Sequence, residues 1–352
     1  PKDKNDVAAI IYTSGTTGKP KGAMITHNNL LAVKMELQAL GLLNVNGIRI
    51  EENLSMLVSL PISHIYGLTV TMMAYTLGAS LVLMPRFELE TSFQIIEKEK
   101  IKLFAGVPTM YLYMSQFANS KNYDVSSVKY WISGAAPLPL EVRQQFEQTF
   151  RTKIIEGYGL TESTASFALQ RLDRPIKANS VGQPIPGVEV RVFDDEGNVL
   201  NTGEIGELAI KGPNVMKGYF RMEEETKKVL KDGWLLTGDV GYIDEDGDIF
   251  IVERKKDLTI RGGFNVYPRE VEEVLLQHPT VMEAGVIGIP DQNLGEVVKA
   301  FVTLKPNASV DEMTSIQLCK QHLAKYKVPE SIEFVANLPK NDLGRILRKE
   351  LK

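Results

Sequence analysis

Apolar, strand-like runs alternate with amphipathic segments through the first half of the chain. The runs are rich in Leu, Ile, Val and Phe, and they lie at residues 54–61, 80–85, 102–108, 128–134 and 153–159. Between them are segments with helical periodicity, each about ten to fifteen residues long. Because parallel strands are joined by crossover helices of about that length, the alternation predicts an α/β fold with a mainly parallel sheet.

The first helix is expected after an opening strand at residues 8–12 and the loop that follows it. Thr26 has a side chain suited to an N-cap, and Gly41 is suited to the end of a helix. The apolar residues on its inner face are Leu30, Val33, Leu37 and Leu40. The sequence therefore predicts an amphipathic helix between Thr26 and Gly41.

Two changes in the pattern divide the chain into three parts. From residue 179 the strands are short and alternating, with no long helix, which indicates a small β-subdomain. From residue 256 short strands mix with two amphipathic helices, which indicates a separate small α+β domain. The predicted parts are the α/β part of a large domain (1–178), its β-subdomain (179–255) and a C-terminal domain (256–352).

Composition and charge narrow the function classes. The 352 residues are 43% hydrophobic and 24% charged, as in a globular protein with a substantial core. The net charge of −4 gives no electrostatic reason to expect nucleic acid or an anionic membrane as a partner. No uninterrupted apolar run reaches the roughly 18 residues of a transmembrane segment. The one cysteine, Cys319, indicates a reducing, cytoplasmic setting and is expected to be a buried apolar side chain.

A loop rich in glycine, hydroxyl and lysine side chains follows the opening strand. It reads TSGTTGKPKG from Thr13 to Gly22. Glycines let backbone N–H groups approach an oxyanion closely, hydroxyls add donors, and lysines add charge. It is not a Walker loop, because Gly15 and Gly18 are separated by two residues, where that motif has four. An anion-binding loop is favoured over a mobile surface loop, because an ordered strand precedes it and a capped helix follows.

This loop resembles the phosphate loop of the adenylate-forming superfamily, which includes acyl-CoA synthetases, peptide-synthetase adenylation domains and firefly luciferase. Five further segments match in the superfamily's order, so the resemblance covers essentially the whole chain. They are LPISHIYG (60–67), SGAAPLP (133–139), EGYGLTES (156–163), GWLLTGDVGYIDEDG (233–247) and IVERKKDLTIRGGFNVYPREVEE (251–273). Members carry a long segment ahead of the loop, so we expect this sequence to begin inside a longer protein.

The resemblance implies which residues hold ATP and Mg²⁺. Glu162 would be the Mg²⁺ ligand, with the oxygen donor that this hard cation prefers, and Thr161 would lie at the phosphates. The ribose hydroxyls would bind Asp239, with Arg254 nearby. The implied phosphate-loop residues are Thr13, Ser14, Gly15, Thr16, Thr17, Gly18, Lys19 and the catalytic Lys21. The implied adenine-site residues are Gly134, Ala135, Ala136, Glu156, Gly157, Tyr158 and Gly159.

Two of these segments have simpler interpretations when each is taken alone. The sequence LTES at residues 160–163 also fits a helix capping box. The sequence DVGYIDEDG at residues 239–247 also fits a solvated hairpin, so the role of Asp239 depends on the preceding Thr-Gly.

The superfamily's reaction has two steps. A carboxylate attacks the α-phosphorus of Mg·ATP, giving an acyl-adenylate and pyrophosphate, and the thiol of CoA then displaces AMP. The small C-terminal domain turns between the steps about a hinge residue that the resemblance places at Lys256. Gly263 would then leave room for the pantetheine of CoA. His64 matches the motif Pro-x-x-His-x-x-Gly and would border the acyl pocket, the alternative being an ordinary core histidine.

One position departs from the superfamily's pattern. Near the C-terminus members have Pro-Lys-x-x-x-Gly-Lys, whose last lysine reaches the α-phosphate and the carboxylate during adenylation. This chain reads PKNDLGR, with Arg345 in that place. Arginine stays cationic, but its planar fork is not equivalent to an ammonium group. The hypothesis is that Arg345, as a catalytic residue, makes adenylation slow and spares thioester formation.

The resemblance is strongest to bacterial fatty-acid–CoA ligases. The expected acyl pocket draws on residues 62–67 and 106–110 and on the backbone near Gly134 and Gly159, which are mostly apolar. The expected partners are therefore ATP, CoA and a medium- or long-chain fatty acid. An aryl acid of the succinylbenzoate type and a nucleotide-binding protein without catalysis are the alternatives. A homodimer is compatible with the sequence, which does not specify an oligomeric state.

Overall fold

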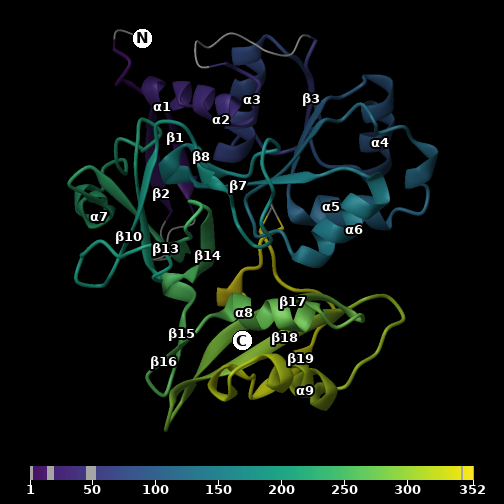
Figure 1. Cartoon of the computed structure of the whole chain (residues 1–352), viewed down its shortest axis with the longest axis vertical. Helices are drawn as coiled ribbons and strands as arrows, with labels where there is room; N and C mark the ends of the chain where they lie inside the picture. The colour runs from purple at the N-terminus through teal and green to yellow at the C-terminus, as the bar shows by residue number, and fades with distance from the viewer. Residues whose placement is uncertain (1–2, 14–19, 45–52, 342–343, 352) are drawn as a thin grey trace. The chain divides into compact units, whose positions relative to one another are not determined.

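The computed structural model of the chain describes residues 3–13, 20–44, 53–341 and 344–351. The chain forms two compact units (Figure 1). The first unit comprises residues 1–237 and 241–251, and the second comprises residues 238–240 and 252–352. The last segment of the first unit ends at residue 251, four residues before residue 255, where the β-subdomain was predicted to end.

A seven-stranded sheet is the centre of the first unit. Its strands, in chain order, are β3 (Ser55–Val58), β4 (Ser80–Leu83), β5 (Leu103–Gly106), β6 (Tyr130–Ser133), β7 (Ile154–Leu160), β8 (Ala165–Leu169) and β9 (Gln183–Pro184). The order across the sheet is β4-β3-β5-β6-β7-β8-β9. The strands from β4 to β7 are parallel, whereas β8 and β9 add antiparallel pairs. The prediction of an α/β fold with a mainly parallel sheet is confirmed.

Aromatic side chains fill the space between this sheet and three of its helices. The helices of this sheet are α3 (Ile65–Leu77), α4 (Leu89–Lys98), α5 (Pro108–Gln116) and α6 (Leu140–Phe150). Trp131 of β6 and Tyr111 of α5 each lie edge-on to Phe146 of α6, with ring centroids 5.0 Å apart. Phe93 of α4 is also fully buried. Helices α4, α5 and α6 therefore share one aromatic core with the strands.

The opening hairpin differs from the prediction in one element. β1 (Val7–Thr13) pairs in antiparallel fashion with β2 (Lys21–Thr26), and the two form a sheet of their own. The sequence had predicted a loop that leads directly into a helix, so β2 was missed. The helix forms as α1 (His27–Leu31) and α2 (Val33–Ala39). Its predicted cap is confirmed: the Asn29 N–H donates to Thr26 Oγ1 (3.1 Å).

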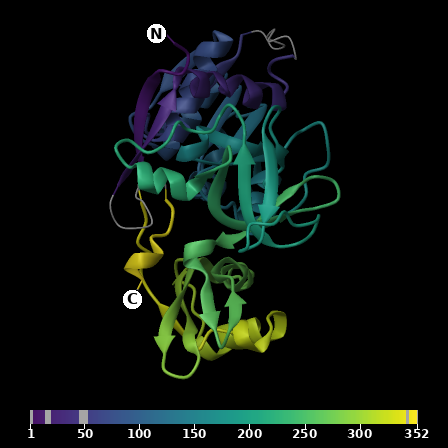
Figure 2. The same ribbon diagram turned by 90° about the vertical axis from the view of Figure 1, so that its left-hand side faces the viewer.

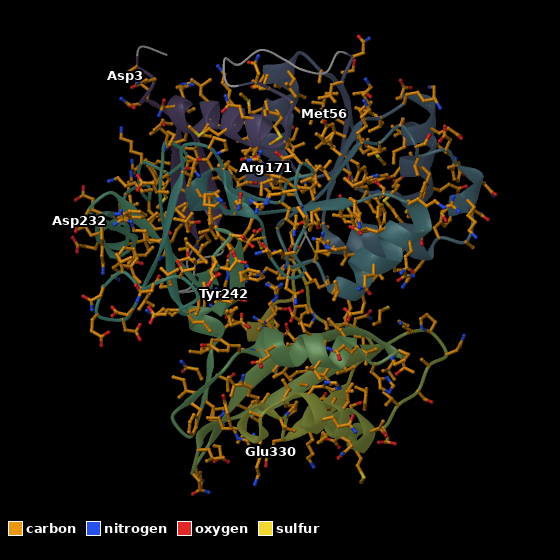
Figure 3. The ribbon with its side chains drawn as sticks, viewed as in Figure 1. Asp3, Met56, Arg171, Asp232, Tyr242 and Glu330 are labelled. Atoms are coloured by element: carbon orange, nitrogen blue, oxygen red, sulfur yellow. The ribbon has the colours of Figure 1, made fainter. Side chains whose placement is uncertain are left out.

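A second, five-stranded sheet is formed by strands between residues 189 and 254. Its strands are β10 (Glu189–Phe193), β11 (Gly206–Lys211), β12 (Leu230–Lys231), β13 (Trp234–Ile243) and β14 (Ile249–Arg254). One short helix, α7 (Glu223–Val229), precedes β12. Tyr242 of β13 stacks on Phe250 of β14 with centroids 4.8 Å apart, and Tyr242 is labelled in Figure 3.

The second unit is a small sheet with a core on each face. Its strands are β15 (Thr259–Arg261), β16 (Phe264–Val266), β17 (Val281–Asp291), β18 (Gly295–Leu304) and β19 (Ser331–Phe334). On one face the sheet packs against α8 (Pro268–Leu276) and α9 (Glu312–His322) (Figure 2). Because side chains alternate along a strand, Phe301 of β18 lies on the opposite face, where it packs with Leu338 and Leu351.

Cys319 lies in α9 and is fully buried in the core under the two helices. Burial raises the pKa of its thiol to about 11. The expectation of a buried, apolar cysteine is confirmed. Within the part of the chain that the structure describes, no helix has the length and apolar character needed to cross a membrane.

Candidate functional site

The carboxyl ends of neighbouring strands bring together segments that are far apart in the sequence. These segments are residues 60–67 after β3, 106–110 from the end of β5, 133–136 from the end of β6 and 157–160 in β7. The Gly134 N–H donates to the Gly106 carbonyl (3.2 Å). The Tyr66 hydroxyl donates to the Ile132 carbonyl (3.2 Å). Ligands of open α/β sheets bind at the carboxyl ends of strands, so the predicted acyl and adenine segments meet where that rule places a ligand.

Close packing explains the spacing Pro-x-x-His-x-x-Gly. The His64 N–H donates to the Pro61 carbonyl (3.0 Å), which turns the chain into α3. A Cβ on Gly67 would lie 2.2 Å from the same carbonyl oxygen. Gly67 is therefore required by the turn itself, whatever the site binds.

Gly67→Ala is expected to lower the free energy of unfolding of the first unit by about 2 to 3 kcal/mol, because the added methyl group overlaps fixed backbone. Gly41→Ala is the control. It meets no atom within 4 Å and has only an unfavourable φ of +72°, so it should cost about 1 kcal/mol. Urea unfolding followed by tryptophan fluorescence measures both, since Trp131 is buried in this unit. Equal losses would contradict the clash.

His64 is the N-cap of α3, in which Gly67 is the third residue. Its Nδ1 accepts a hydrogen bond from the Tyr66 N–H (3.2 Å), which leaves the ring proton on Nε2. Burial lowers the pKa of His64, so the ring is neutral near pH 7. The capping contact is one structural reason for a histidine at position 64. The role of His64 at an acyl pocket stays a prediction.

The predicted adenine segment has an unusual backbone after β6. A Cβ on Gly134 would lie 3.1 Å from Tyr66 Cζ, so the tyrosine ring covers this glycine. Ala135 has a φ of +68°, which is uncommon for a residue with a side chain. Strained backbone of this kind concentrates at functional sites, which is consistent with the predicted role of this segment.

The strand β7 is braced by a buried ion pair. Glu156 Oε2 lies 3.1 Å from Arg143 Nη2, and Glu156 Oε1 accepts from the Leu138 N–H (3.2 Å). The carboxylate of Glu156 is thus engaged within the fold, and its contact with a cofactor stays a prediction. Tyr158 lies edge-on to Phe167 of β8, with centroids 5.3 Å apart. Gly157 and Gly159 lie in β7, and their place in an adenine site stays a prediction.

Glu162 lies in a single 3₁₀ turn, η2 (Thr161–Ser163), directly after β7. The Tyr219 hydroxyl donates to Glu162 Oε1 (2.7 Å). The Leu160 N–H donates to Ser163 Oγ (2.8 Å), so the serine closes the turn. The predicted roles of Thr161 at the phosphates and of Glu162 as a metal ligand stay predictions, and Tyr219 was missed.

Lys21 begins β2 and is nearly buried. Its Nζ lies 2.5 Å from Glu225 Oε2 of α7 and 5.2 Å from the centre of the Tyr219 ring. The structure therefore places Lys21 in an ion pair, and its catalytic role stays a prediction. Thr13, at the end of β1, pairs with Lys21 across the hairpin. The predicted phosphate-loop residues Ser14, Gly15, Thr16, Thr17, Gly18 and Lys19 lie outside the described residues.

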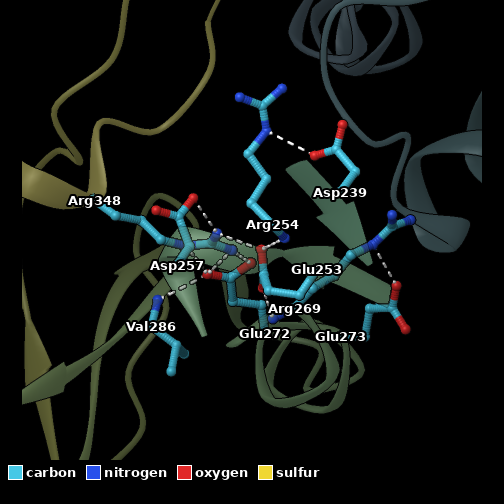
Figure 4. Close-up of polar contacts among 9 residues, drawn as sticks. All are labelled: Asp239, Glu253, Arg254, Asp257, Arg269, Glu272, Glu273, Val286 and Arg348. Atoms are coloured by element: carbon cyan, nitrogen blue, oxygen red, sulfur yellow. Dashed lines mark hydrogen bonds and ion pairs between the residues drawn. The ribbon is translucent and has the colours of Figure 1, made fainter. Parts of the chain in front are cut away.

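The second unit contains the predicted ribose pair (Figure 4). Asp239 is fully buried, and its Oδ1 lies 3.1 Å from Arg254 Nε. A buried carboxylate is retained when a cation compensates its charge. The two residues that the resemblance assigned to the ribose are therefore neighbours, and their contact with a nucleotide stays a prediction.

The predicted hinge follows two residues later. Lys256 lies in the 3₁₀ turn η3 (Lys255–Asp257), where its side chain is exposed. The pKa of Lys256 is lowered, first by partial desolvation beside its neighbours and then by the nearby charges of Arg254 and Arg345. Gly263 forms a two-residue turn with Gly262 between β15 and β16, where both have positive φ. Such a turn favours glycine at both positions, so the turn alone explains Gly263.

Arg345 lies on a small hairpin at the C-terminal end of the described chain. We call the described residues 339–341 and 344–347 the C-terminal hairpin; Lys340 and Ile346 form a β-bridge across it. The Arg345 N–H donates to Asn341 Oδ1 (2.9 Å), and the Asn341 N–H donates to the Arg345 carbonyl (3.0 Å). The arginine therefore projects from a defined backbone position.

Glu36 is a buried acid beside the site. It lies in α2 with 4% of its surface exposed, and its carboxyl Oε1 accepts from the Ser166 N–H of β8 (3.1 Å). Burial raises the pKa of Glu36 to about 8. Tyr66, which covers Gly134, has a raised pKa caused first by burial and then by the charge of Glu36. The sequence had assigned this position no role.

Two family profiles match the chain. The profile described as AMP-binding enzyme matches residues 1–220, and the profile described as AMP-binding enzyme C-terminal domain matches residues 270–345. The first match alone covers more than half of the chain. The chain belongs to the AMP-binding enzyme family.

Relatives within the AMP-binding enzyme family include ligases for two kinds of acid. The long-chain-fatty-acid–CoA ligase of Bacillus subtilis (strain 168) is 43% identical over 350 residues, which cover 99% of this chain and 62% of that ligase. The 2-succinylbenzoate–CoA ligase of Bacillus licheniformis is 37% identical over 350 residues, which cover 99% of this chain and 70% of that ligase. The chain thus spans about three fifths of the length of the fatty-acid–CoA ligases it matches.

Solved structures of similar proteins share the fold. The ATP-bound MatB from Rhodopseudomonas palustris superposes with a TM-score of 0.91 at 35% identity, covering 99% of this chain and 68% of that one. The o-succinylbenzoate CoA synthetase MenE from Bacillus subtilis, in complex with ATP and magnesium ion, gives a TM-score of 0.88 at 34% identity, covering 99% and 70%. The α/β architecture is thus that of the AMP-binding enzyme family.

Proposed function

We propose that the protein carrying this chain is an AMP-forming acid–thiol ligase that converts a medium- or long-chain fatty acid into its CoA thioester. The observation that carries the proposal is the meeting of the predicted segments at one edge of the parallel sheet, in a member of the AMP-binding enzyme family. The relationship to a long-chain-fatty-acid–CoA ligase at 43% identity supports the same reaction.

The reaction has two balanced steps. One oxygen of the acid's carboxylate forms a bond to the α-phosphorus of ATP, and the bond to pyrophosphate breaks. The sulfur of CoA then attacks the acyl carbon, and AMP leaves while the thiol loses its proton. Such transfers depend mainly on positioning and on charge stabilisation by fixed donors and cations.

Different groups of described residues would share this work. The backbone at Gly134 to Ala136 and the ring of Tyr158 would hold the adenine. Asp239 would accept hydrogen bonds from the ribose, and Arg254 keeps its carboxylate compensated. Arg345 would supply the positive charge near the reacting carboxylate and α-phosphate during adenylation.

The site fits a magnesium ion that arrives with ATP. Among the described residues no group of three His, Cys, Asp or Glu side chains could hold a metal ion. Glu162 contributes a single carboxylate, which Tyr219 already orients. Mg²⁺ is usually bound by one or two carboxylates together with substrate phosphates, so one oriented carboxylate is sufficient. When bound, the ion would neutralise phosphate charge.

Apolar walls favour a fatty acid as the substrate. Val107, Met110 and Tyr111 are buried where the chain leaves β5. An aryl acid is the second candidate, because the 2-succinylbenzoate–CoA ligase is 37% identical over the same length of this chain. No arginine or lysine lies in residues 60–67 or 106–110 to pair with a second carboxylate, so we favour the fatty acid.

Acid-dependent exchange of pyrophosphate into ATP, with Mg²⁺ and without CoA, tests the proposal. We expect exchange with decanoate and palmitate and much less with benzoate or 2-succinylbenzoate. Glu162→Gln is the negative control and should lose the exchange. Exchange with aryl acids alone would overturn the fatty-acid proposal. Nucleotide binding without any acid-dependent exchange would favour a nucleotide-binding protein without catalysis.

A further inference from the structure

One arginine of the second unit holds three carboxylates. Arg348 lies in the 3₁₀ turn η5 (Arg348–Glu350), and its side chain is mostly buried. Nη1 lies 2.9 Å from Glu253 Oε1 and 3.5 Å from Asp257 Oδ2. Nη2 lies 2.8 Å from Glu272 Oε2, and Nε donates to Glu272 Oε1 (3.2 Å). Figure 4 shows the guanidinium at the centre of these groups.

The carboxylates are held from their other sides as well. Glu272 Oε1 accepts from the Val286 N–H of β17 (2.8 Å). Glu253 Oε2 accepts from the Arg269 N–H at the start of α8 (2.9 Å). Burial raises the pKa of Glu272, and Arg348 is the main influence that opposes this rise. Removing the guanidinium would leave buried carboxylates facing one another, which is more disruptive than losing an exposed ion pair.

The network joins two segments that the sequence separates widely. Glu253 and Asp257 lie three residues before and one residue after Lys256, the predicted hinge. Arg348 lies three residues after Arg345, and its turn directly follows the C-terminal hairpin. Arg348 therefore connects the end of this hairpin to both sides of Lys256.

Other contacts already seat the hairpin on the sheet. Lys340 Nζ lies 2.5 Å from Glu283 Oε1 of β17. Ile346 packs on the face of the sheet formed with Phe301, Leu338 and Leu351. These contacts fix the hairpin to the sheet, whereas those of Arg348 reach Glu253 and Asp257 beside the hinge.

We propose that Arg348 is a positioning residue for adenylation: it couples the segment around Lys256 to the hairpin that carries Arg345. This inference rests on the proposed function for its catalytic consequence, while the coupling itself does not depend on any activity. Arg348 does not touch the reacting atoms in this proposal. It sets where Arg345 lies when the hinge is in its adenylation conformation, so its loss should impair the first step and spare the second.

Hydrogen–deuterium exchange tests the coupling without any activity. In Arg348→Met we expect amide exchange to become at least about tenfold faster in peptides covering 253–257 and 345–351, with the β17–β18 core unchanged. Arg269→Met is the matched control, since it removes an arginine whose side chain pairs with Glu273 within α8 (3.0 Å). Unchanged exchange in both peptides would overturn the proposal. Faster exchange throughout the second unit would also overturn it, by showing a merely structural role.

The two half-reactions test the catalytic consequence. In Arg348→Met we expect acid-dependent pyrophosphate exchange to fall at least about tenfold, with thioester formation from a supplied acyl-adenylate and CoA changed less than about twofold. Arg348→Lys keeps the charge without the fork, so partial recovery is expected, and it replaces the methionine variant if that protein does not fold. Equal losses in both steps would overturn the proposal. If the unaltered protein catalyses neither step, the proposed function fails, and hydrogen exchange still decides the coupling.

Discussion

Arg345→Met should lower acid-dependent pyrophosphate exchange by about 100-fold or more, because removal of a single fixed donor from a charge-stabilising site has effects of this size. The backbone of Arg345 is held by Asn341 on the C-terminal hairpin. The variant should therefore fold normally and lose only the charge. Thioester formation from a supplied acyl-adenylate should be unchanged, since Arg345 is assigned to the first step alone.

Arg345→Lys distinguishes two possibilities. Either arginine makes adenylation slower than lysine would, or any positive charge at this position is sufficient. Lysine restores the residue that the superfamily carries here, and its ammonium group is a more compact donor than guanidinium. We expect the exchange rate to rise several-fold. Lys349→Met is the control, because Lys349 is also a cation close enough to influence Lys256; its exchange rate should stay within about twofold. An unaltered rate in Arg345→Lys would show that arginine does not slow the step.

Stability of the first unit should decrease as the pH rises, and Glu36 should be a principal cause. Its pKa is raised from 4.5 to about 8 in the folded protein because the carboxyl is buried. Below pH 4.5 the group is neutral in both states, so its full contribution to stability is present. Between about pH 4.5 and pH 8 the group ionises only in the unfolded chain, so its contribution to stability is lost progressively until the pH has risen through about 8. At about 1.4 kcal/mol for each pKa unit, the loss is on the order of 4 kcal/mol between pH 5 and 9.

Glu36→Gln should remove this pH dependence while keeping an oxygen that accepts from the Ser166 N–H. Urea unfolding at a series of pH values, followed by tryptophan fluorescence, measures the difference between variant and parent. Glu196→Gln, at an exposed glutamate of the same unit, is the control and should leave the slope unchanged. If the free energy of unfolding of Glu36→Gln changed with pH as steeply as that of the parent, Glu36 would be ionised in the folded protein.

The parts of the fold that could be predicted are those that short-range patterns determine. The apolar runs specified the parallel strands, and Thr26 specified the start of the first helix. β2 was missed because its sequence, KGAMIT, continues the glycine- and lysine-rich loop and has few β-branched residues. Its strand conformation depends on pairing with β1, which is a contact that local propensity does not report.

The site was partly predictable because its motifs coincide with turns. Gly67, Gly262 and Gly263 lie where packing or positive φ excludes other residues. A glycine in such a motif can be required by the turn in which it lies as well as by the function. The structure identifies the requirement that comes from the turn. The proximity of Asp239 and Arg254 was implied only by the resemblance, because the two residues are fifteen positions apart in the sequence.

Glu36 and Arg348 could not be identified from the sequence in the same way. Position 36 lies three residues after Val33 and four before Leu40, which places it on the apolar side of the helix. This spacing was the one indication in the sequence that Glu36 is buried. A lone glutamate in an amphipathic helix is nevertheless more often solvated than buried. The partners of Arg348 lie 76 to 95 residues away along the chain, and no local pattern contains that information.

The burial of Cys319 makes the chain suitable for site-specific chemical labelling. At pH 7 a thiol with a pKa of about 11 is ionised in roughly one molecule in ten thousand, and its full burial also denies access to reagents. A cysteine introduced at an exposed position would react with a maleimide far faster. A fluorophore pair placed on the two units could therefore test the prediction that they turn about Lys256, with the native cysteine left in its core.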